Sequence, residues 1–399
     1  MATQHRKMDP FAVEGDFFRI KDLLEPEERQ TLERIRSFLA DKVEPTAGEL
    51  WAHAESPLNL VDAIRDLGIT GIPGDAPGIT ARSPLLSGLI SMEMARVDPS
   101  FATFFGVHSG LGMGSIRECG SEEQRQRWLP QMVEWRKIGA FGLTEPLVGS
   151  GTAGGLLTTA RRDGGDWVLN GEKRWIGNGT FADLVVIWAR DEADGQVKGF
   201  VVEKGTPGFT ARKLEGKIAL RGVQNAHIVL EDVRVPEENR LQRADSFRDT
   251  ARVLKVTRGG VAWQAIGCSI GAYEAARAYA VEREQFGKPI ASFQLIQDLL
   301  SRMLGNITAS QTMAVRMAQL HAEGALSEAQ AAMAKMFCTT RMRETVAWAR
   351  EVFGGNGILL EYKAARFFAD AEALYSYEGT RDMNSLIVGR AATGISAFV

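Results

Sequence analysis

A loop rich in glycine and hydroxyl groups, at residues 144–152, has the composition of a ligand-binding segment. Gly149, Ser150 and Gly151 leave the backbone bare beside the hydroxyl groups of Thr144 and Thr152. Such a loop can bring backbone N–H groups to the polar edge of a ligand. Because roughly two in three Gly/Ser loops are ordinary turns, this segment alone does not assign a chemistry.

Four further segments carry residues of types that bind cofactors or move protons. They contain Trp175, the pair Arg283 and Phe286, the pair Gly354 and Gly355, and Glu378 between an aromatic residue and a glycine. Taken one at a time, each has a common structural explanation. A tryptophan after a turn usually packs into a core, a glycine after a helix usually ends it, and a single glutamate in a turn is usually solvated.

Three regions of different pattern must position these residues. Residues 23–119 have apolar positions at helical spacing, although the Gly/Pro-rich stretch 68–84 is expected to be a loop. Residues 141–242 contain short β-branched runs separated by glycine turns. From residue 245 the chain has long Ala-, Met- and Leu-rich stretches that are apolar on more than one face.

This order predicts an α+β fold of three parts. We expect an N-terminal all-α domain at 1–140, a middle antiparallel β domain of sandwich or barrel type at 141–244, and a C-terminal four-helix bundle at 245–399. A chain of 399 residues is more than one hydrophobic core usually serves, which agrees with two or three domains.

Composition excludes several classes of function. The 47 basic and 50 acidic residues give a net charge of -3, which does not favour binding to nucleic acid or a membrane surface. No apolar run approaches the length of a membrane-spanning helix, and no targeting signal is recognisable. Cys119, Cys268 and Cys338 lie far apart, which suits a reducing compartment, and no histidine motif predicts a metal site. We therefore expect a soluble, cytoplasmic protein without a metal.

Taken together, in this order and at this spacing, the five segments resemble the acyl-CoA dehydrogenase family. The resemblance runs from about residue 25 to residue 398 and rests on LTEP and GS (143–150), KRWIGN (173–178), REQFG (283–287), FGGNG (353–357) and YEGT (377–380). Within the family, the chain looks most similar to the group of glutaryl-CoA dehydrogenases and plant-type short-chain acyl-CoA oxidases. The ending GRAATGISAF supports that placement.

The resemblance implies an FAD-dependent enzyme that oxidises the Cα–Cβ bond of a short- to medium-chain acyl-CoA to the trans-2-enoyl-CoA. Glu378 would remove the α-proton while flavin N5 takes the β-hydride. Because that proton is weakly acidic, the carboxylate needs a dry, apolar pocket in which its pKa rises toward neutrality. The developing enolate needs hydrogen bonds to the thioester oxygen, which the family takes from the Glu backbone N–H and a flavin ribityl hydroxyl.

The resemblance also assigns binding residues. The implied FAD contacts are Phe141, Leu143, Thr144, Gly149, Ser150, Trp175, Ile176, Gly177, Arg283, Phe286, Gln294, Glu351, Gly354, Gly355, Thr380 and Asp382. The implied substrate contacts are Ser150, Arg258, Ala102, Thr103 and Gly379. Arg283, Phe286 and Gln294 correspond to positions that come from a neighbouring subunit, so a dimer is the minimum and a homotetramer is the family norm. Electron-transfer flavoprotein is the expected partner.

Three positions depart from the family pattern. Gly177 stands where many dehydrogenases have Thr or Ser, and the missing hydrogen bond is worth about 1 kcal/mol. Gly151 replaces the usual Asp, which puts the rigidity of the loop and the affinity for FAD in question. Glu351 stands where many relatives have Gln.

The acyl tail is expected to be uncharged. Glutaryl-specific members carry Arg-Ser where this chain has Ala102 and Thr103, and burial of a tail carboxylate without that guanidinium would cost several kcal/mol. Three functional hypotheses remain: a dehydrogenase that reduces electron-transfer flavoprotein, an oxidase that reduces oxygen, and a non-catalytic FAD- or CoA-binding member. Gly177 keeps the second open, and an intact Glu378 disfavours the third.

Overall fold

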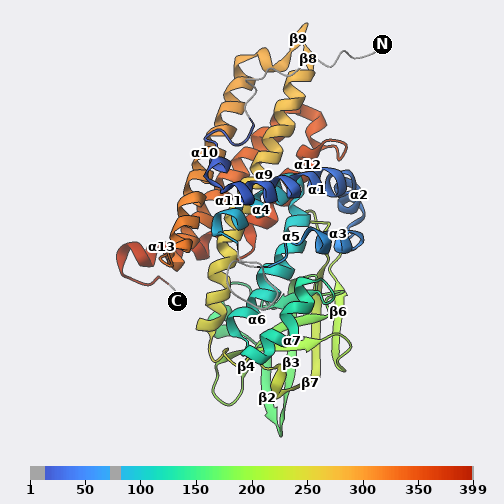
Figure 1. Cartoon of the computed structure of the whole chain (residues 1–399), viewed down its shortest axis with the longest axis vertical. Coiled ribbons are helices and arrows are strands. Elements are labelled where there is room, and N and C mark those ends of the chain that lie inside the picture. The colour runs from blue at the N-terminus through green and yellow to red at the C-terminus, as the bar shows by residue number, and fades with distance from the viewer. Residues whose placement is uncertain (1–13, 72–81, 398–399) are drawn as a thin grey trace.

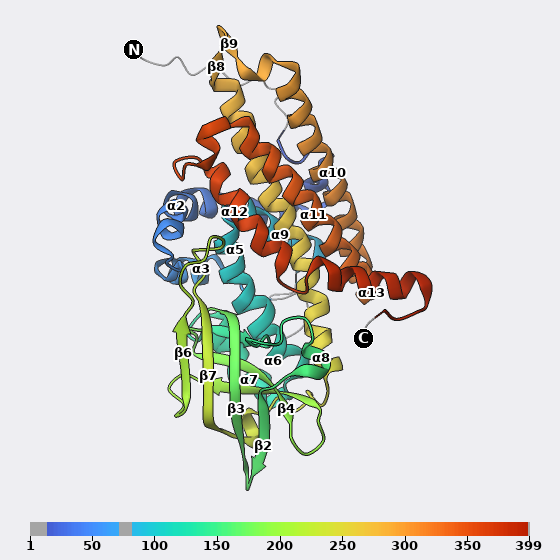
Figure 2. The same cartoon turned by 180° about the vertical axis from the view of Figure 1, so that it is seen from behind.

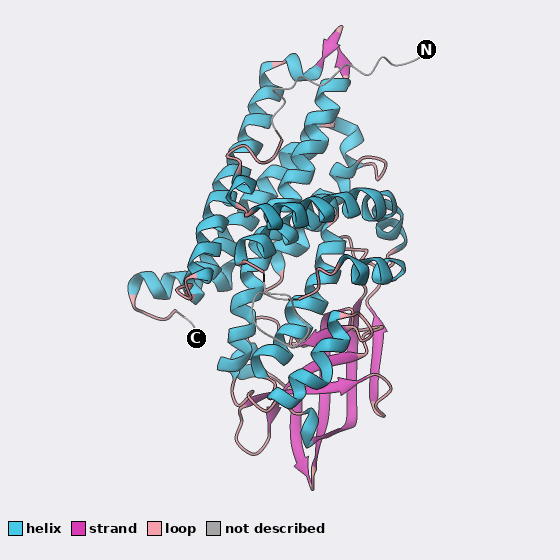
Figure 3. Ribbon diagram, viewed as in Figure 1, coloured by secondary structure: helices cyan, strands magenta, loops and turns pink. Residues whose placement is uncertain are grey.

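The computed structural model describes residues 14–71 and 82–397 (Figure 1). Helices, then a sheet, then helices follow one another along the chain, which confirms the predicted α+β class (Figure 3). Most of the stretch 68–84 that was predicted to be a loop lies outside the described residues. The first strand begins at Gly139 and the long helix α9 at Phe247. The division at 140/141 and 244/245 stays a prediction.

The N-terminal part is helical. Its regular α-helices are α1 (Pro26–Phe38), α2 (Glu44–His53), α3 (Val61–Leu67), α4 (Pro84–Val97), α5 (Pro99–Gly106), α6 (Met113–Cys119) and α7 (Glu122–Val133). Shorter helical turns lie at Ile20–Leu23 and Leu58–Leu60, and π-helical segments at Leu39–Val43 and Val107–Gly112. Ser83 and Asp98 cap α4 and α5, each followed by a proline at the first helical position.

The middle part is a sheet. Its strands are β1 (Gly139–Gly142), β2 (Thr159–Asp163), β3 (Asp166–Gly177), β4 (Leu184–Asp191), β5 (Val197–Glu203), β6 (Phe209–Lys213) and β7 (Asn225–Pro236), with short helices α8 (Thr152–Gly155) and Glu237–Asn239. They hydrogen-bond in the order β1-β4-β2-β3-β7-β6, and β5 pairs with β4. Side chains from β1 to β5 and from β7 share one core, so the sheet curves over its own interior.

One detail of the predicted middle part is wrong: the sheet is mixed and not wholly antiparallel. Strand β4 runs parallel to both β1 and β2, whereas the other pairings are antiparallel. Strand length and β-branched content, on which the prediction rested, identify strands but do not encode their pairing direction. The parallel pairing of β1 matters because it fixes where the loop after Gly142 leaves the sheet.

The C-terminal part confirms the predicted bundle. Its elements are α9 (Phe247–Glu282), the hairpin β8 (Glu284–Gln285) and β9 (Lys288–Pro289), a turn at Ile290–Ser292, α10 (Gln294–Ala322), α11 (Glu328–Val352), a turn at Gly354–Ile358, α12 (Lys363–Ser376) and α13 (Arg381–Thr393). Figures 1 and 2 show α9 running from the sheet at one end of the molecule to the β8–β9 hairpin at the other. Among the described residues, no helix is long and apolar enough to cross a bilayer.

Helix α4 packs directly on α9, and this contact builds one wall of the site. The largest helical core cluster contains residues of both, so the N-terminal helices and the bundle share one interior. A Cβ on Gly88 would overlap the ring of Trp263, and one on Gly267 would overlap the carbonyl of Met92. These close approaches need glycine. The contacts advance in the same direction along both helices, from 88 on 263 to 92 on 267, so α4 and α9 run parallel.

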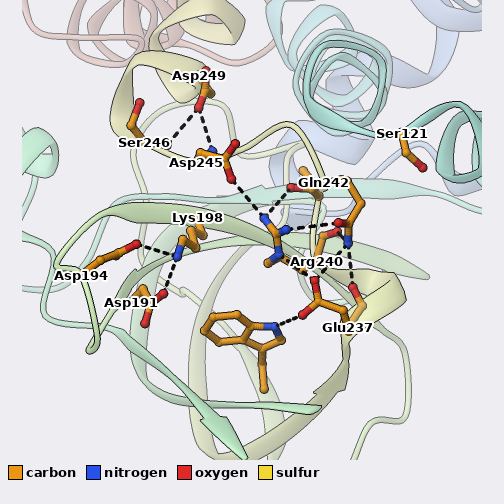
Figure 4. Close-up of polar contacts among 12 residues, drawn as sticks. Ser121, Asp191, Asp194, Lys198, Glu237, Arg240, Gln242, Asp245, Ser246 and Asp249 are labelled. Atoms are coloured by element: carbon orange, nitrogen blue, oxygen red, sulfur yellow. Dashed lines mark hydrogen bonds and ion pairs between the residues drawn. The ribbon is translucent and has the colours of Figure 1, made fainter. Parts of the chain in front are cut away.

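The junction between the sheet and α9 is held by polar contacts (Figure 4). Arg240 donates to Glu237 Oε1 at 3.0 Å, to Gln242 Oε1 at 3.1 Å and to Asp245 Oδ1 at 3.4 Å. Asp249 then accepts from the backbone N–H of Ser246 at 2.9 Å in a capping box at the start of α9. These contacts fix the start of α9 to the sheet, and both elements carry residues predicted to belong to the site.

Candidate active site

A cavity of about 180 Å³ lies between the N-terminal helices and α9. Its wall comes from α4, α5, the π-helical segment after α5, residues 256–264 of α9, the end of α10, and the loop that precedes α13. Most of that wall is apolar. Glu378, the predicted base, lines the cavity together with the two predicted substrate contacts Ala102 and Thr103.

Glu378 has the environment that a base for a weak carbon acid needs. Burial raises the pKa of its carboxyl above the ordinary value, and the Thr257 hydrogen bond, Arg258 and Lys335 partly offset that rise. The hydroxyl of Thr257 donates to Oε2 at 2.7 Å. The other carboxylate oxygen makes no hydrogen bond within the described chain, so it is free to face a ligand in the cavity.

The loop that carries Glu378 is strained and clamped. Glu378 has a φ of 55°, a left-handed conformation that costs a residue other than glycine of order 1–3 kcal/mol. The buried ammonium of Lys335, from α11, donates to the carbonyls of Tyr375 at 2.7 Å and Gly379 at 2.8 Å. Asn384 adds a bond to the Gly379 carbonyl at 2.9 Å. These bonds hold the turn in a shape that it would not adopt alone.

A second network fixes the side of the cavity near α5. Tyr377 donates to Gln264 Oε1 at 2.6 Å, and its hydroxyl lies 3.4 Å from that of Thr103. Gln264 in turn donates to the carbonyl of Ala102 at 3.3 Å. Tyr377, the residue before Glu378, is therefore held by α9 and α5, and this fixes the position of Glu378 in the cavity wall.

Other predicted substrate contacts do not line this cavity. Arg258 faces Glu328 of α11, with Nη1 2.9 Å from Oε1, and it acts on Glu378 only through its charge. Ser150 is exposed on its loop, and Gly379 does not contribute to the cavity wall. The direct contact with Glu378 comes instead from Thr257, one residue before Arg258, and the sequence did not predict it.

Trp175 stands on the open face of the sheet. The register between β3 and β7 shifts between Lys173 and Ile176, and this bulge leaves Trp175 with a φ of 68° and 56% of its surface exposed. Asn225 donates to the Trp175 carbonyl at 3.1 Å, and the guanidinium of Arg174 lies 5.7 Å from the ring centroid. The exposed indole, held at a strained backbone position, is available for a flat ligand to stack on it.

The loop that begins with Thr144 is anchored to the same strand. Thr144 exchanges hydrogen bonds with the backbone of Arg174, accepting at 2.8 Å through its carbonyl and donating at 2.5 Å through its hydroxyl. Further on, Gly149 and Ser150 are exposed, and a Cβ on Gly149 would meet no atom within 4 Å. The bare backbone of this loop is thus open to a ligand.

A buried ion pair lies under that loop. Lys173 Nζ is 2.7 Å from Glu145 Oε1 and also donates to the Leu143 carbonyl at 3.1 Å. Glu145 accepts from the backbone N–H groups of Leu157 at 2.7 Å and Thr158 at 2.9 Å. Glu145 belongs to the LTEP motif, but its ion pair with Lys173 was not predicted from the sequence. Because β3 also contains Asp166, Asn170, Glu172 and Arg174, its sequence gives no signal that Lys173 is the buried charge.

Three predicted flavin contacts on this part are buried. Phe141 and Leu143 pack into the cluster between the sheet and α6 and α7, and Ile176 packs into the sheet core. Gly177 is buried against the π-helical segment, where a Cβ would lie 2.9 Å from Cγ2 of Val107. The absence of a side chain at 177 therefore has a packing reason in this chain.

The remaining predicted flavin contacts lie elsewhere. Thr380 caps α13 by accepting from Met383 N at 3.2 Å, and Asp382 is exposed beside it. The others are exposed at the far end of the bundle: Arg283, Phe286, Gln294, Glu351, Gly354 and Gly355. That end is about 40 Å from Thr257 along α9, and Figures 1 and 2 show it opposite the sheet. One chain does not bring the two groups together.

Comparison with known proteins gives the same three-part division. The family models "Acyl-CoA dehydrogenase, N-terminal domain", "middle domain" and "C-terminal domain" match residues 25–136, 140–233 and 247–393. An acyl-CoA dehydrogenase of Bacillus subtilis is 33% identical, with 90% of this chain and 96% of the relative aligned. A short-chain-specific acyl-CoA dehydrogenase of Clostridium acetobutylicum is 32% identical, over 91% and 97%.

A solved structure is equally similar. The glutaryl-CoA dehydrogenase of Mycobacterium smegmatis in complex with FADH2 superposes with a TM-score of 0.92 at 34% identity, covering 96% of this chain and 98% of that one. The similarity therefore extends over all three parts of the chain.

Proposed function

Because this chain belongs to the acyl-CoA dehydrogenase family, we propose that it oxidises the Cα–Cβ bond of a short- to medium-chain acyl-CoA to the trans-2-enoyl-CoA. Family membership makes the chain an FAD-dependent oxidoreductase. The observation that carries the proposal is Glu378, a carboxylate with a raised pKa on the wall of an apolar cavity. Bound FAD supplies the acceptor for the hydride that leaves Cβ.

Glu378 is the base in this proposal. Its Oε1 takes the proton from Cα, while Thr257 holds Oε2. The backbone N–H of Glu378 makes no hydrogen bond to any described residue, so it can donate to the thioester oxygen as negative charge develops there. In this proposal the left-handed turn at Glu378 presents that N–H and the carboxylate to the same thioester, and this accounts for the strained backbone.

The open face at Trp175 fits a flat, partly polar ring. In our proposal the indole would cover one side of the flavin, and Thr144, Gly149 and Ser150 would offer hydroxyl and N–H groups to its polar edge. The fit rests on an exposed indole and on glycine backbone with open space beside it. The anchored loop keeps these donors in place before the cofactor arrives.

A second chain completes the cofactor site in this proposal. The exposed apolar side chains at the tip of the bundle include Phe286 (93% exposed), Leu295 (81%) and Ile358 (72%), a surface that a subunit contact would cover. Arg283 and Gln294 lie beside them and would reach the partner's flavin site. We propose a dimer as the minimum and a homotetramer, the family norm, as the working assembly.

The acyl group is short in this proposal. The cavity holds about 180 Å³, less than the roughly 300–1,000 Å³ of pockets for drug-sized ligands. A relative of 32% identity is specific for short chains, which agrees. We propose electron-transfer flavoprotein as the acceptor of the electrons, with oxygen as the competing acceptor.

Anaerobic bleaching of the bound flavin with a panel of saturated acyl-CoAs tests the proposal. Bleaching by short acyl-CoAs, and none in Glu378→Gln with full FAD occupancy, is the expected result. If no acyl-CoA bleaches a fully loaded protein, the proposal fails. Admitting air afterwards separates the acceptors, because an oxidase recolours rapidly and releases peroxide whereas a dehydrogenase recolours slowly.

A further inference from the structure

The loop between β6 and β7, residues 214–224, links the sheet to both helical parts of the chain. Its Arg221 guanidinium donates to the backbone carbonyl of Trp51, near the end of α2, at 3.0 Å. On the other side, the backbone N–H of Leu220 donates to Oδ1 of Asp370, on α12, at 2.6 Å. Leu220 has a φ of 44°, a left-handed conformation that persists where surrounding contacts fix the backbone. The loop is therefore held in place between the sheet and the helices.

Lys217 holds the inside of this loop together. Its ammonium group donates to the carbonyl of Leu220 at 2.9 Å, to that of Val223 at 2.6 Å and to Oδ1 of Asn225 at 2.6 Å. These three acceptors match the three hydrogens of an ammonium group. Burial lowers the pKa of Lys217 to about 8, and the carboxylate of Asp370 offsets part of that effect. A desolvated cation with a full set of acceptors is a fixed point, unlike a lysine that extends into solvent.

The contact with Lys217 orients the amide of Asn225. An ammonium group only donates, so it must face the amide oxygen, and the amide nitrogen is left to donate elsewhere. That nitrogen, Nδ2, donates to the backbone carbonyl of Trp175 at 3.1 Å. If the amide were free to turn over, its oxygen would face the Trp175 carbonyl, and two acceptors do not bind each other. Lys217 therefore selects the one orientation of Asn225 that holds the bulge of β3.

The carbonyl of Trp175 belongs to the strained bulge that presents the indole. Trp175 has a left-handed backbone and a ring that is more than half exposed, so packing alone does not fix the ring. In the described part of the chain, the amide of Asn225 is the one side-chain group that hydrogen-bonds to Trp175. Because the direction of a side chain follows its backbone, a contact that fixes the carbonyl also restricts the direction of the indole.

We propose that Lys217 is a positioning residue of the flavin site: through Asn225 it fixes the backbone of Trp175 and hence the angle at which the indole meets the flavin. The proposal rests on the proposed function, which places the flavin against Trp175. None of the three residues belongs to the described wall of the cavity, so the effect falls on the cofactor and not on the acyl group. The same loop binds Asp370 on α12, the helix that ends just before Glu378, so the indole is set in a frame shared with the base.

The test measures how tightly the holoenzyme holds FAD, from the rise in flavin fluorescence on dilution. Lys217→Met removes the ammonium group. Asn225→Asp keeps a partner for that group but puts an oxygen in place of the donor to the Trp175 carbonyl. Each variant should raise the Kd for FAD at least about fivefold, as expected for one lost hydrogen bond. The control is Lys213→Met, whose ammonium lies 3.5 Å from Oε1 of Glu215, and it should leave the Kd unchanged.

A double-mutant cycle with Trp175 separates positioning from general support of the loop. In Trp175→Ala, which has no indole to orient, Lys217→Met should change the Kd for FAD by less than about twofold. A fivefold loss that persists without the indole would overturn the proposal, because Lys217 would then act on FAD by another route. Lys217→Arg keeps a cation that only donates, and it should restore part of the affinity. If Lys217→Met does not fold, Asn225→Asp carries the same cycle, since it retains the contact with Lys217.

This inference and the proposed function fail under different results. If Lys217→Met and Asn225→Asp hold FAD as tightly as the wild type while butyryl-CoA bleaches the wild-type flavin, this inference falls and the proposed function stands. If both variants release FAD as expected but no acyl-CoA bleaches the fully loaded wild type, the proposed function falls and the role of Lys217 in binding FAD stands.

Discussion

The hydroxyl of Thr257, on α9, donates a 2.7 Å hydrogen bond to the carboxylate of Glu378, on the loop before α13. The bond joins two parts of the chain 121 residues apart and favours the ionised carboxylate, against the burial that favours the neutral acid. In the proposed reaction, this balance sets the pH above which the base is free to accept a proton.

Thr257→Val should move the acid limb of the kcat/KM profile to higher pH. A base works when deprotonated, so its rate rises with pH through its pKa, and losing a hydrogen bond to the ionised form raises that pKa further. Thr257→Ser keeps the hydroxyl and should leave the limb in place. An unchanged limb in the Val variant would mean that the limb does not report Glu378.

Glu378→Gln should stabilise the protein most at high pH. Burial raises the folded-state pKa of Glu378, so wild type binds a proton there more readily when folded than when unfolded. Its stability from this group is therefore present below the unfolded pKa and is lost as pH rises through the folded pKa. The gain in Tm of the Gln variant should grow between pH 5 and pH 8. A gain independent of pH would contradict the assignment.

Lys335→Met should loosen the turn that presents the base. The variant leaves the carbonyls of Tyr375 and Gly379 without their buried donor, which costs about 2–4 kcal/mol of unfolding free energy. It also removes a charge that lowers the pKa of Glu378, so the acid limb of kcat/KM should move up as well. Lys335→Arg, which keeps the charge, should retain the limb position even if packing suffers. Thermal melting and a pH profile on the same samples separate the two effects.

Sequence alone could predict the order of helices and strands, because hydrophobic periodicity is local, and the YEGT motif could nominate Glu378 as the proposed base. It could not predict that Thr257 holds the carboxylate of Glu378, since that depends on how α9 packs against the loop before α13. Lys335 looked like one charge on an Ala- and Met-rich helix until the fold placed it under Tyr375 and Gly379.

Lys173→Met should weaken retention of FAD more than it changes the cavity. Removing one partner of the buried pair leaves Glu145 without its cation, at a cost of about 3–5 kcal/mol. Burial raises the pKa of Glu145, but Lys173 and the loop hydrogen bonds bring it below the usual range, so wild-type stability from this group is lost as pH falls through that lowered pKa. The double variant Lys173→Met with Glu145→Leu should recover part of the Tm. FAD content after gel filtration, with Tm, checks both points.

Gly177→Ser should destabilise the chain on its own and be tolerated with Val107→Ala. The new Cβ would lie 2.9 Å from Cγ2 of Val107, and overpacking of this kind costs about 1–3 kcal/mol. In the double variant, the oxygen reactivity of the reduced flavin tests whether a hydroxyl at 177 matters to the choice of acceptor. If the single variant melts at the wild-type temperature, Val107 is not what excludes a side chain there.

Phe286→Asp should dissociate the assembly and release FAD together. Phe286 is 93% exposed in one chain and lies about 40 Å along α9 from Thr257, so it cannot serve its own chain's cavity. A charge placed in an apolar contact between subunits carries the cost of its desolvation, which should shift the sedimentation profile toward the monomer. Because the proposed flavin site needs Arg283 and Gln294 of the neighbouring chain, FAD occupancy should fall in proportion to the monomer fraction.

The control is Arg212→Asp, which places the same acidic side chain at an exposed position on β6 of the sheet. Release of FAD without dissociation would place Phe286 at the cofactor but not at the contact between subunits, and dissociation with full FAD retention would show that one chain holds the flavin by itself.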